Sequence, residues 1–268
     1  MDWSSATSLS DSRLTATWAA LRGKRRTGLV PYLTAGFPTI ASSADALRAV
    51  DEWADVLEVG VPFSDPLADG PTIQASTFRA LANGMTLPGA LELIAKSKLQ
   101  APVVLFTYLN PVLRYGLDKL LRDAASIGVT GLLLTDLPSG ADLTIEGAVQ
   151  RSPLDLIRLV APTTQRARME RAVAGAEGFL YLIARLGVTG ASSSVAADLA
   201  ASVARVRDVT TLPIVVGFGV STPVQARTVA ALADGVVIGS ALVDVLGRDG
   251  VPAAAAFLSQ IRSAIDEH

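Results

Sequence analysis

Short apolar segments alternate with amphipathic stretches along the whole chain, and no other feature of the sequence limits the fold as strongly. The apolar segments predict strands at Leu29–Thr34, Asp55–Gly60, Pro102–Tyr108, Gly131–Asp136, Asp155–Ala161, Gly178–Ile183, Leu212–Gly217 and Gly235–Ile238. Apolar residues at spacings of three to four predict helices between them, such as Ser42–Trp53, Leu87–Leu99, Leu117–Ile127 and Pro223–Ala233. Eight such units with almost continuously apolar strands favour parallel strands closed into a barrel.

The length agrees with that interpretation, since 268 residues are close to the ~250 typical of a (β/α)8 TIM barrel. An amphipathic stretch at about Asp11–Arg22 predicts an extra N-terminal helix before the first strand. No low-complexity linker divides the chain, so we expect one domain over residues 1–268, with residues 1–10 flexible. The alternative is a doubly wound open sheet, which usually has a Gly-rich turn after its first strand. Here that strand leads into Thr34-Ala-Gly-Phe-Pro38 instead.

The composition excludes several kinds of chemistry. The chain has no Cys, and His268 is its only histidine, so disulfides, zinc–thiolate sites, Ser-His-Asp triads and Cys-His pairs are excluded. Acid–base work must therefore fall to Asp, Glu, Lys or Tyr. A net charge of −2 without a basic stripe argues against nucleic acid, and the short run Arg22–Arg26 is interpreted as a flexible basic patch. No apolar run is long enough for a membrane span, and no signal layout is present, so we expect a cytoplasmic protein without a membrane partner.

Two carboxylates follow each other closely around the second predicted strand. Glu58 lies inside the apolar run of that strand, where a charge is expensive to desolvate unless it has a partner or a task. Asp69 comes eleven positions later, in a loop shaped by three prolines that also holds Asp65. Such a pair can have its protonation states set apart by environment. The plain alternative is a glutamate paired with an arginine at the end of a strand.

Glycines follow three consecutive strands at the end of the barrel where such folds hold their active sites. Gly217-Phe-Gly219 follows the seventh strand and Gly239-Ser240 follows the eighth, where barrels often bind phosphate through backbone N–H groups. Gly187 and Gly190 give the loop after the sixth strand similar backbone freedom. Each glycine alone is best explained as a turn residue, but three such loops together favour an anion site.

Large apolar and aromatic side chains gather around the same predicted strand ends. Several of them belong to the barrel core, yet five of the chain's few aromatic residues fall there, which suits a flat, apolar, aromatic ligand. The residues are Tyr32, Phe106, Tyr108, Leu133, Leu159, Tyr181 and Phe218. The small, polar stretch 191–197 after Gly190 is interpreted as a mobile loop able to close over the site.

At this level of detail the sequence strongly resembles the tryptophan synthase alpha chain family, in order from about residue 15 to the C-terminus. The motifs that carry the resemblance are Pro31-Tyr-Leu-Thr-Ala-Gly-Phe-Pro38, Leu57-Glu-Val-Gly-Val-Pro-Phe-Ser-Asp-Pro-Leu-Ala-Asp-Gly-Pro-Thr-Ile-Gln74, Gly187-Val-Thr-Gly190, Gly217-Phe-Gly219 and Gly239-Ser240. The resemblance implies a barrel that cleaves indole-3-glycerol phosphate into indole and glyceraldehyde 3-phosphate. It also implies no cofactor in this chain and an α2β2 assembly with a pyridoxal-phosphate beta chain.

The resemblance further assigns roles by motif. Glu58 matches the family's acid–base glutamate, Asp69 the aspartate that holds the indole N–H, and Tyr181 the tyrosine beside the glutamate. Thr189 and Gly190 match the lid loop. The phosphate binders match Gly190, Gly219, Gly239 and Ser240; the indole pocket matches Tyr32, Phe106, Tyr108, Leu133, Thr135, Leu159 and Phe218; and Asp65 falls in the loop that faces the beta chain. The chain departs from the family at Tyr32, often Phe, and at Ala184, often Ser.

The residues suit a retro-aldol step that begins with protonation of indole C3. Glu58 is the candidate acid, because an apolar pocket raises the pKa of its carboxyl, and Asp69 is the candidate acceptor of the N–H where positive charge develops. Three alternatives stay open on sequence alone. They are another phosphate-binding barrel enzyme, which would normally want a Lys, His or metal; a non-catalytic regulatory subunit; and a stand-alone lyase that releases free indole.

Overall fold

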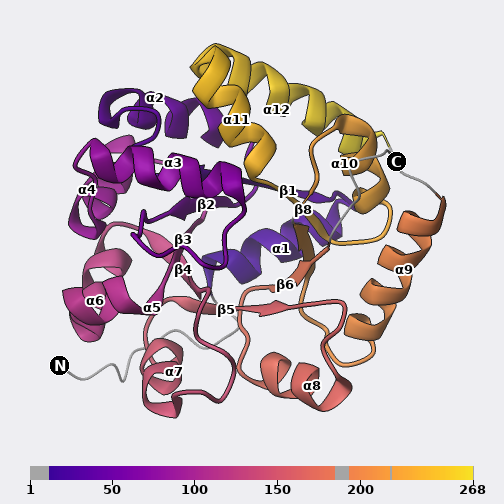
Figure 1. Ribbon diagram of the computed structural model, residues 1–268. Helices are drawn as coiled ribbons and strands as arrows, with labels where there is room; N and C mark the ends of the chain where they lie inside the picture. The colour runs from indigo at the N-terminus through magenta and orange to yellow at the C-terminus, as the bar shows by residue number, and fades with distance from the viewer. Residues whose placement is uncertain (1–11, 185–192, 218, 268) are drawn as a thin grey trace.

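Eight parallel strands form a closed barrel in which each strand pairs with its neighbours in chain order and β8 pairs with β1 (Figure 1). The computed structural model describes residues 12–184, 193–217 and 219–267. The strands are β1 Gly28–Thr34, β2 Leu57–Gly60, β3 Val103–Thr107, β4 Val129–Leu134, β5 Asp155–Val160, β6 Leu180–Ile183, β7 Ile214–Gly217 and β8 Gly235–Ile238. The predicted TIM barrel is therefore confirmed, and the open sheet is excluded.

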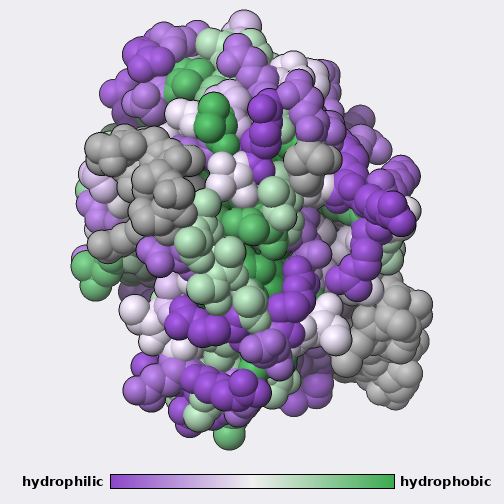
Figure 2. Space-filling model, turned by 90° about the vertical axis from the view of Figure 1, so that its right-hand side faces the viewer, coloured by the Kyte–Doolittle hydropathy of each residue, from purple (hydrophilic) through white to green (hydrophobic). Residues whose placement is uncertain are grey.

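Helices surround the barrel as an outer ring (Figure 1). The ring consists of α2 Ile40–Asp51, α3 Pro71–Ala82, α4 Leu87–Ser97, α5 Leu109–Tyr115, α6 Leu117–Ser126, α7 Leu143–Gln150, α8 Arg166–Ala174, α9 Ser193–Arg207, α10 Pro223–Ala230, α11 Ser240–Asp249 and α12 Val251–Asp266. Helix α1 Arg13–Gly23 lies across the centre of the view in Figure 1 instead. On the face that Figure 2 shows, hydrophilic residues surround a group of more hydrophobic residues near the middle. No helix in the described part of the chain is long and apolar enough to cross a membrane.

The period-2 geometry of the strands divides their side chains between two cores. Leu57 and Val59 belong to the larger core between the strands and the helices. Val104 and Phe106 belong to a second core inside the barrel, together with Tyr32. Because Tyr32 pairs in register with Glu58, and Glu58 with Val104, the carboxylate of Glu58 is carried on an inward-facing position.

The N-terminal helix α1 closes one end of the barrel. Ser12 caps it by accepting from the Thr15 N–H, and the Ser12 hydroxyl donates to the Asp155 carboxylate over 2.6 Å. Trp18 packs into the inner core, and its ring occupies the space above Gly28, where a Cβ would lie only 2.5 Å from it. Helix α1 fills the N-terminal end of the barrel, and the cavity of the functional site is lined by residues such as Gly239 and Ser240 that follow the carboxyl ends of the strands.

The basic run Arg22–Arg26 is not the flexible patch that the sequence was interpreted to contain. The run begins in the last turn of α1 and continues past its C-cap, Lys24, and Arg26 binds the Asp55 carboxylate over 2.9 Å and Asp266 over 3.3 Å. Arg262 of α12 binds the other oxygen of Asp55, also over 2.9 Å. These partners come from the segment just before β2 and from the last helix, and they hold Arg26 in place.

Two other segments differ from the sequence-based expectation. Strand β4 ends at Leu134, because Asp136 has left the strand and accepts from the Leu109 N–H at the start of α5 over 2.7 Å. The segment 191–197, expected as a loop, is helical from Ser193 onward, and residues 185–192 lie outside the described part of the chain.

Candidate active site

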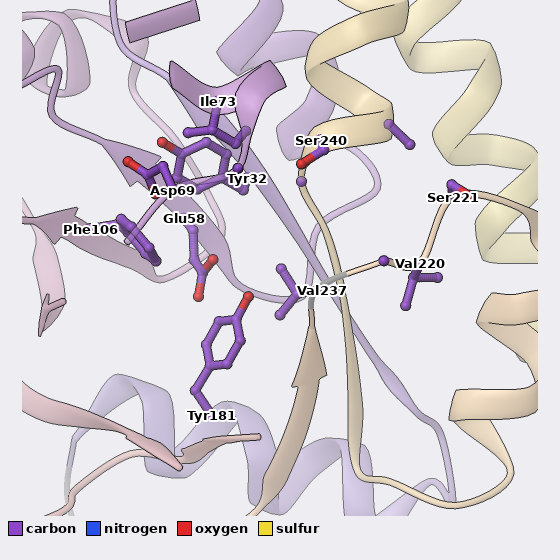
Figure 3. A pocket seen from close by; sticks show the side chains of 14 residues that line it. Tyr32, Glu58, Asp69, Ile73, Phe106, Tyr181, Val220, Ser221, Val237 and Ser240 are labelled. Atoms are coloured by element: carbon purple, nitrogen blue, oxygen red, sulfur yellow. The ribbon is translucent and has the colours of Figure 1, made fainter. Parts of the chain in front are cut away.

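Glu58 is the most unusual side chain at the carboxyl ends of the strands. It has no exposed surface, and both of its carboxylate oxygens are buried without a hydrogen-bond partner in the described residues. Burial raises the pKa of this carboxyl to about 8. The alternative of a glutamate paired with an arginine is excluded for the part of the chain that the structure describes. The carboxylate points toward the hydroxyl end of Tyr181 (Figure 3).

Asp69 lies at the end of the β2–α3 loop and is held by Tyr108. The Tyr108 hydroxyl donates to Oδ2 of Asp69 over 3.0 Å and accepts from the Ala68 N–H over 3.0 Å. The Gln74 side chain donates to the Asp69 carbonyl over 2.9 Å, which fixes the loop against the first turns of α3. Burial raises the pKa of the Asp69 carboxyl to about 6, while the Tyr108 hydrogen bond opposes the shift. The two carboxyls therefore differ in pKa although they face one cavity.

Two tyrosines fit above glycines on neighbouring strands. A Cβ on Gly60 would lie 2.0 Å from the Tyr32 hydroxyl, and one on Gly217 would lie 2.2 Å from the Tyr181 hydroxyl. Each phenol thus occupies the space that an inward side chain on the next strand would fill. Phe106 meets the Tyr32 ring edge-on at 5.3 Å between centroids. Burial is the largest cause that raises the pKa of both phenols above the usual value, so both stay protonated.

The two carboxyls and the aromatic residues line a cavity of about 150 Å³ (Figure 3). The lining comprises Tyr32, Glu58, Asp69, Gly70, Ile73, Phe106, Tyr181, Gly219, Val220, Ser221, Val237, Gly239, Ser240 and Ala241. A second cavity of about 490 Å³ is lined by Leu67, Ala68, Asp69, Gly70, Phe106, Thr135, Leu159 and Ile183. Asp69, Gly70 and Phe106 line both, so the two cavities adjoin around Asp69.

Backbone groups suited to an anion line one side of the first cavity. Gly219 has a φ of +97°, which favours glycine, and Gly239 precedes Ser240 at the start of α11. The first N–H groups of a helix lack intrahelical acceptors and attract negative charge. Ser221 stands beside them, where its N–H and its hydroxyl both donate to Oε1 of Gln225, over 2.9 and 3.0 Å.

Most of the residues predicted for the site come together. Glu58, Asp69, Tyr32, Phe106, Tyr181, Gly219, Gly239 and Ser240 line the first cavity, Thr135 and Leu159 line the second, and Tyr108 binds Asp69. Leu133 is fully buried in the inner core and lines neither cavity. Thr189, Gly190 and Phe218 lie outside the described residues. Asp65 is exposed on the loop, next to Ser64, whose hydroxyl donates to it.

Some lining residues were not predicted. Val237 could have been found from the inward alternation of β8, since Gly239 two positions later faces the same cavity. Ile73 and Ser221 lie outside the strands, in α3 and in the loop before α10, where strand alternation gives no signal. Within the described residues, no group of three or more His, Cys, Asp or Glu side chains could hold a metal ion.

Comparisons with known proteins identify relatives over almost the whole chain. The family model described as "Tryptophan synthase alpha chain" matches residues 18–263. The tryptophan synthase alpha chain of Geobacter sulfurreducens is 44% identical over 265 residues, covering 95% of this chain and 99% of that one. That of Chloroflexus aurantiacus is 43% identical over 262 residues, covering 95% and 98%.

Solved structures give the same result. A structure of Mycobacterium tuberculosis tryptophan synthase superimposes with a TM-score of 0.87 at 38% identity, covering 95% of this chain and 98% of that one. The tryptophan synthase subunit alpha of Legionella pneumophila superimposes with a TM-score of 0.88 at 35% identity, covering 96% and 100%. The similarity therefore extends over sequence, fold and length.

Proposed function

The chain belongs to the tryptophan synthase alpha chain family, and on that premise we propose that Glu58 and Asp69 divide the acid–base work of the family's reaction. The alpha chain cleaves a carbon–carbon bond of indole-3-glycerol phosphate in tryptophan biosynthesis, giving indole and glyceraldehyde 3-phosphate. The family needs no cofactor in this chain. A stand-alone lyase that releases free indole and a non-catalytic regulatory subunit are not favoured. What remains is to assign the steps to side chains.

Glu58 is the acid that protonates C3 of the indole ring. Its carboxyl is buried, has no other hydrogen-bond partner among the described residues, and has its pKa raised to about 8, so it is largely protonated near neutrality. Protonation at C3 gives an indolenine with positive charge on its nitrogen. The bond between C3 and the side-chain carbon then breaks, and its electron pair returns to the ring. The side-chain hydroxyl loses its proton and becomes the aldehyde; Glu58, ionised by the first step, can take that proton.

Asp69 accepts the N–H of the ring in its ionised form. Its carboxylate faces the cavity with one oxygen bound by Tyr108, and the other oxygen is the natural acceptor for the substrate. Positive charge develops on the ring nitrogen as C3 is protonated, so the fixed negative charge stabilises the transition state more than the ground state. Tyr108 contributes by holding that charge in position.

The phosphate lies at the opposite side of the cavity, against Gly219, Gly239 and Ser240. Gly219 allows the backbone to approach closely, and the start of α11 offers N–H groups and the Ser240 hydroxyl. The indole ring then lies against Phe106 and Tyr32, whose edge-to-face contact forms an aromatic wall. Thr189, Gly190 and Phe218 keep their predicted roles in substrate binding as part of the same proposal.

One observation carries this assignment above the others. A fully buried carboxyl with two unpaired oxygens lowers the stability of the fold, so its presence is best explained by a catalytic role. Glu58 also shares its cavity with a second carboxyl of lower pKa. A purely structural residue at this position would be apolar or paired.

The pH dependence of kcat/KM is expected to be bell-shaped. Activity needs ionised Asp69 and is lost as the pH falls through about 6, the value to which burial raises the pKa of that carboxyl. Activity also needs protonated Glu58 and is lost as the pH rises through about 8. Steady-state rates between pH 5 and 9 check both limbs, since kcat/KM reports the free enzyme. A profile that rises steadily to pH 9 would contradict the role of Glu58 as the acid.

The partner is a tryptophan synthase beta chain that carries pyridoxal phosphate, in an α2β2 assembly. Exposed apolar residues support a docking face at the carboxyl ends of three consecutive strands. Leu67, 91% exposed, follows β2; Leu113, 52% exposed, lies in α5 after β3; and Leu143, 76% exposed, begins α7 after β4. Asp65 lies on the same loop as Leu67 and belongs to this face. A cytoplasmic location is part of the same proposal.

Indole release from indole-3-glycerol phosphate by the purified chain, with and without a beta chain, tests the proposal. Release that rises when the beta chain is added supports both the reaction and the partner. An equal rate of indole release with and without the beta chain would reject the docking face and favour a stand-alone lyase. Absence of indole under both conditions would reject the assigned chemistry.

A further inference from the structure

Three hydroxyl groups connect helix α3 to the wall of the cavity. The Ser76 hydroxyl lies 2.8 Å from the Ile73 carbonyl of its own helix and 2.7 Å from the Thr34 hydroxyl, and its one proton can go to either. The Thr34 hydroxyl lies 3.5 Å from the hydroxyl of Tyr32, which lines the cavity. Thr34 and Ser76 are each 1% exposed, so water does not compete for these contacts. Neither residue lines the cavity, and the mechanism above uses neither.

The chain of hydroxyls can order its protons in two ways. Each hydroxyl has one proton to donate. If Ser76 donates to Ile73, Thr34 donates to Ser76 and Tyr32 donates to Thr34, so the Tyr32 oxygen presents lone pairs to the cavity. If Ser76 donates to Thr34 and Thr34 donates to Tyr32, the Tyr32 proton points into the cavity. Each hydrogen bond polarises the next, so the ordering is cooperative.

A negative charge in the cavity selects the second ordering. Figure 3 shows the Tyr32 hydroxyl at the Asp69 end of the cavity, while the Tyr181 hydroxyl faces Glu58. After burial, the charge of Asp69 is the largest cause that raises the pKa of Tyr32, ahead of Glu58. An ionised Asp69 repels lone pairs and attracts an O–H dipole. In the 3.5 Å contact between Thr34 and Tyr32 the Thr34 hydroxyl donates to the Tyr32 oxygen, so the Tyr32 proton is not used there and can point to the cavity.

We propose that Thr34 and Ser76 are positioning residues that aim the O–H dipole of Tyr32 into the cavity toward Asp69 and thereby favour the ionised form of Asp69. The proposal rests on the proposed function of Asp69 as the acceptor of the substrate N–H. It assigns a task to the hydroxyl by which Tyr32 differs from a phenylalanine. The titratable groups that face Asp69 in the described part of the chain are Tyr108, which donates to it directly, and Tyr32, Tyr181 and Glu58.

The chain offers matched variants for a test. Tyr32→Phe removes the dipole, Thr34→Val breaks the chain, and Thr34→Ser keeps the hydroxyl and serves as the rescue. Ser76→Ala removes the far end of the chain. Ser97→Ala is the control, because Ser97 is 3% exposed and its hydroxyl donates to the Leu93 carbonyl of its own helix over 2.8 Å, without a second hydroxyl as partner among the described residues.

The first measurement is the pKa of the Asp69 carboxyl in the free chain, by carbon NMR of labelled aspartate, with the signal assigned by its loss in Asp69→Asn. Tyr32→Phe is expected to raise this pKa by about half a unit to one unit, as for the loss of a dipole that favours the charged form. Thr34→Val raises it in the same direction by less, and Ser76→Ala by less again. Thr34→Ser and Ser97→Ala leave it unchanged.

The second measurement is kcat/KM for indole release against pH. Below its pKa, a carboxyl loses tenfold in ionised fraction per unit, so Tyr32→Phe should lower kcat/KM about three- to tenfold at pH 5.5 and less than twofold at pH 7.5. In an Asp69→Asn background the same substitution should have no further pH-dependent effect. A loss that is equal at both pH values would indicate altered packing and overturn the proposal.

The outcomes separate this proposal from the assigned reaction. An unchanged Asp69 pKa in Tyr32→Phe overturns the hydroxyl chain even if the enzyme releases indole as expected. A shift that Thr34→Val and Thr34→Ser cause equally also overturns it, because the serine keeps the hydroxyl. A raised Asp69 pKa in Tyr32→Phe and Thr34→Val supports the chain, even if no variant releases indole and the proposed function fails.

Discussion

Replacing Glu58 with glutamine is expected to lower kcat for indole release by about 10²–10⁴-fold, the usual cost of losing an acid–base group. The amide has nearly the same volume and fits the same cavity, but it cannot give a proton to C3. Substrate binding should change little, because Asp69 and the phosphate side of the cavity are untouched. The loss therefore appears in kcat more than in KM, and a steady-state assay at pH 7 separates the two. A turnover within tenfold of the unmodified chain would show that Glu58 is not the acid.

The same variant distinguishes a functional carboxyl from a structural one. Burial raises the folded-state pKa of Glu58 to about 8, above the ordinary value of 4.5, so the folded chain holds a proton that the unfolded chain releases. The stability of the native protein therefore decreases as the pH rises from 4.5 towards 8. Glutamine does not ionise, so thermal unfolding at pH 8 should show the variant at least as stable as the unmodified chain. A lower Tm at pH 8 would mean that the carboxylate supports the fold.

Replacing Asp69 with asparagine is the second change with a large expected effect. We expect kcat/KM to fall by about 10²–10³-fold, as when one oriented electrostatic group is removed from a developing charge. A neutral amide can still meet the Tyr108 hydroxyl, so the loop should keep its place while the stabilising charge is lost. The acid limb of the pH profile near 6 should disappear as well, because that limb belongs to this carboxyl.

A matched control lies four residues earlier on the same loop. Asp65 is exposed and does not line either cavity, so Asp65→Asn should leave the activity of the isolated chain within about twofold, as is usual for surface substitutions. Equal losses in Asp65→Asn and Asp69→Asn would point to the conformation of the loop and reject the charge. An unchanged acid limb in Asp69→Asn would assign that limb to another group.

Site residues whose position follows from one strand and the turn after it could be predicted from the sequence. Glu58 stood out because a carboxylate within an apolar strand is rare, and barrel geometry placed it at the functional end. The glycines at positions 219 and 239 could be found in the same way, since each follows closely after a predicted strand. Strand alternation and local turns carry this information, and both are visible in a few consecutive residues.

Contacts between distant residues could not be predicted. The Tyr108–Asp69 hydrogen bond joins residues 39 positions apart, and it depends on the path of a loop that the sequence does not specify. The interpretation of Arg22–Arg26 as flexible was wrong for the same reason, since its partners Asp55 and Asp266 lie 29 and 240 positions from Arg26. Leu133 was expected in the pocket because it lies near the end of a strand, but its side chain is fully buried in the inner core and lines neither cavity.

The two tyrosine–glycine pairs have a consequence for how this barrel can acquire new substrates. In the pairs Tyr32–Gly60 and Tyr181–Gly217 the tyrosine fills the space beside the glycine, so a larger residue at the glycine position requires a smaller one at the tyrosine position. The glycine cannot change first, because any side chain there would collide with a phenol. The tyrosine can, and its shortening would open a hollow in the wall beside each carboxyl without moving a strand. Adaptation to bulkier aromatic rings therefore has a permitted order of substitutions, with the tyrosines before the glycines.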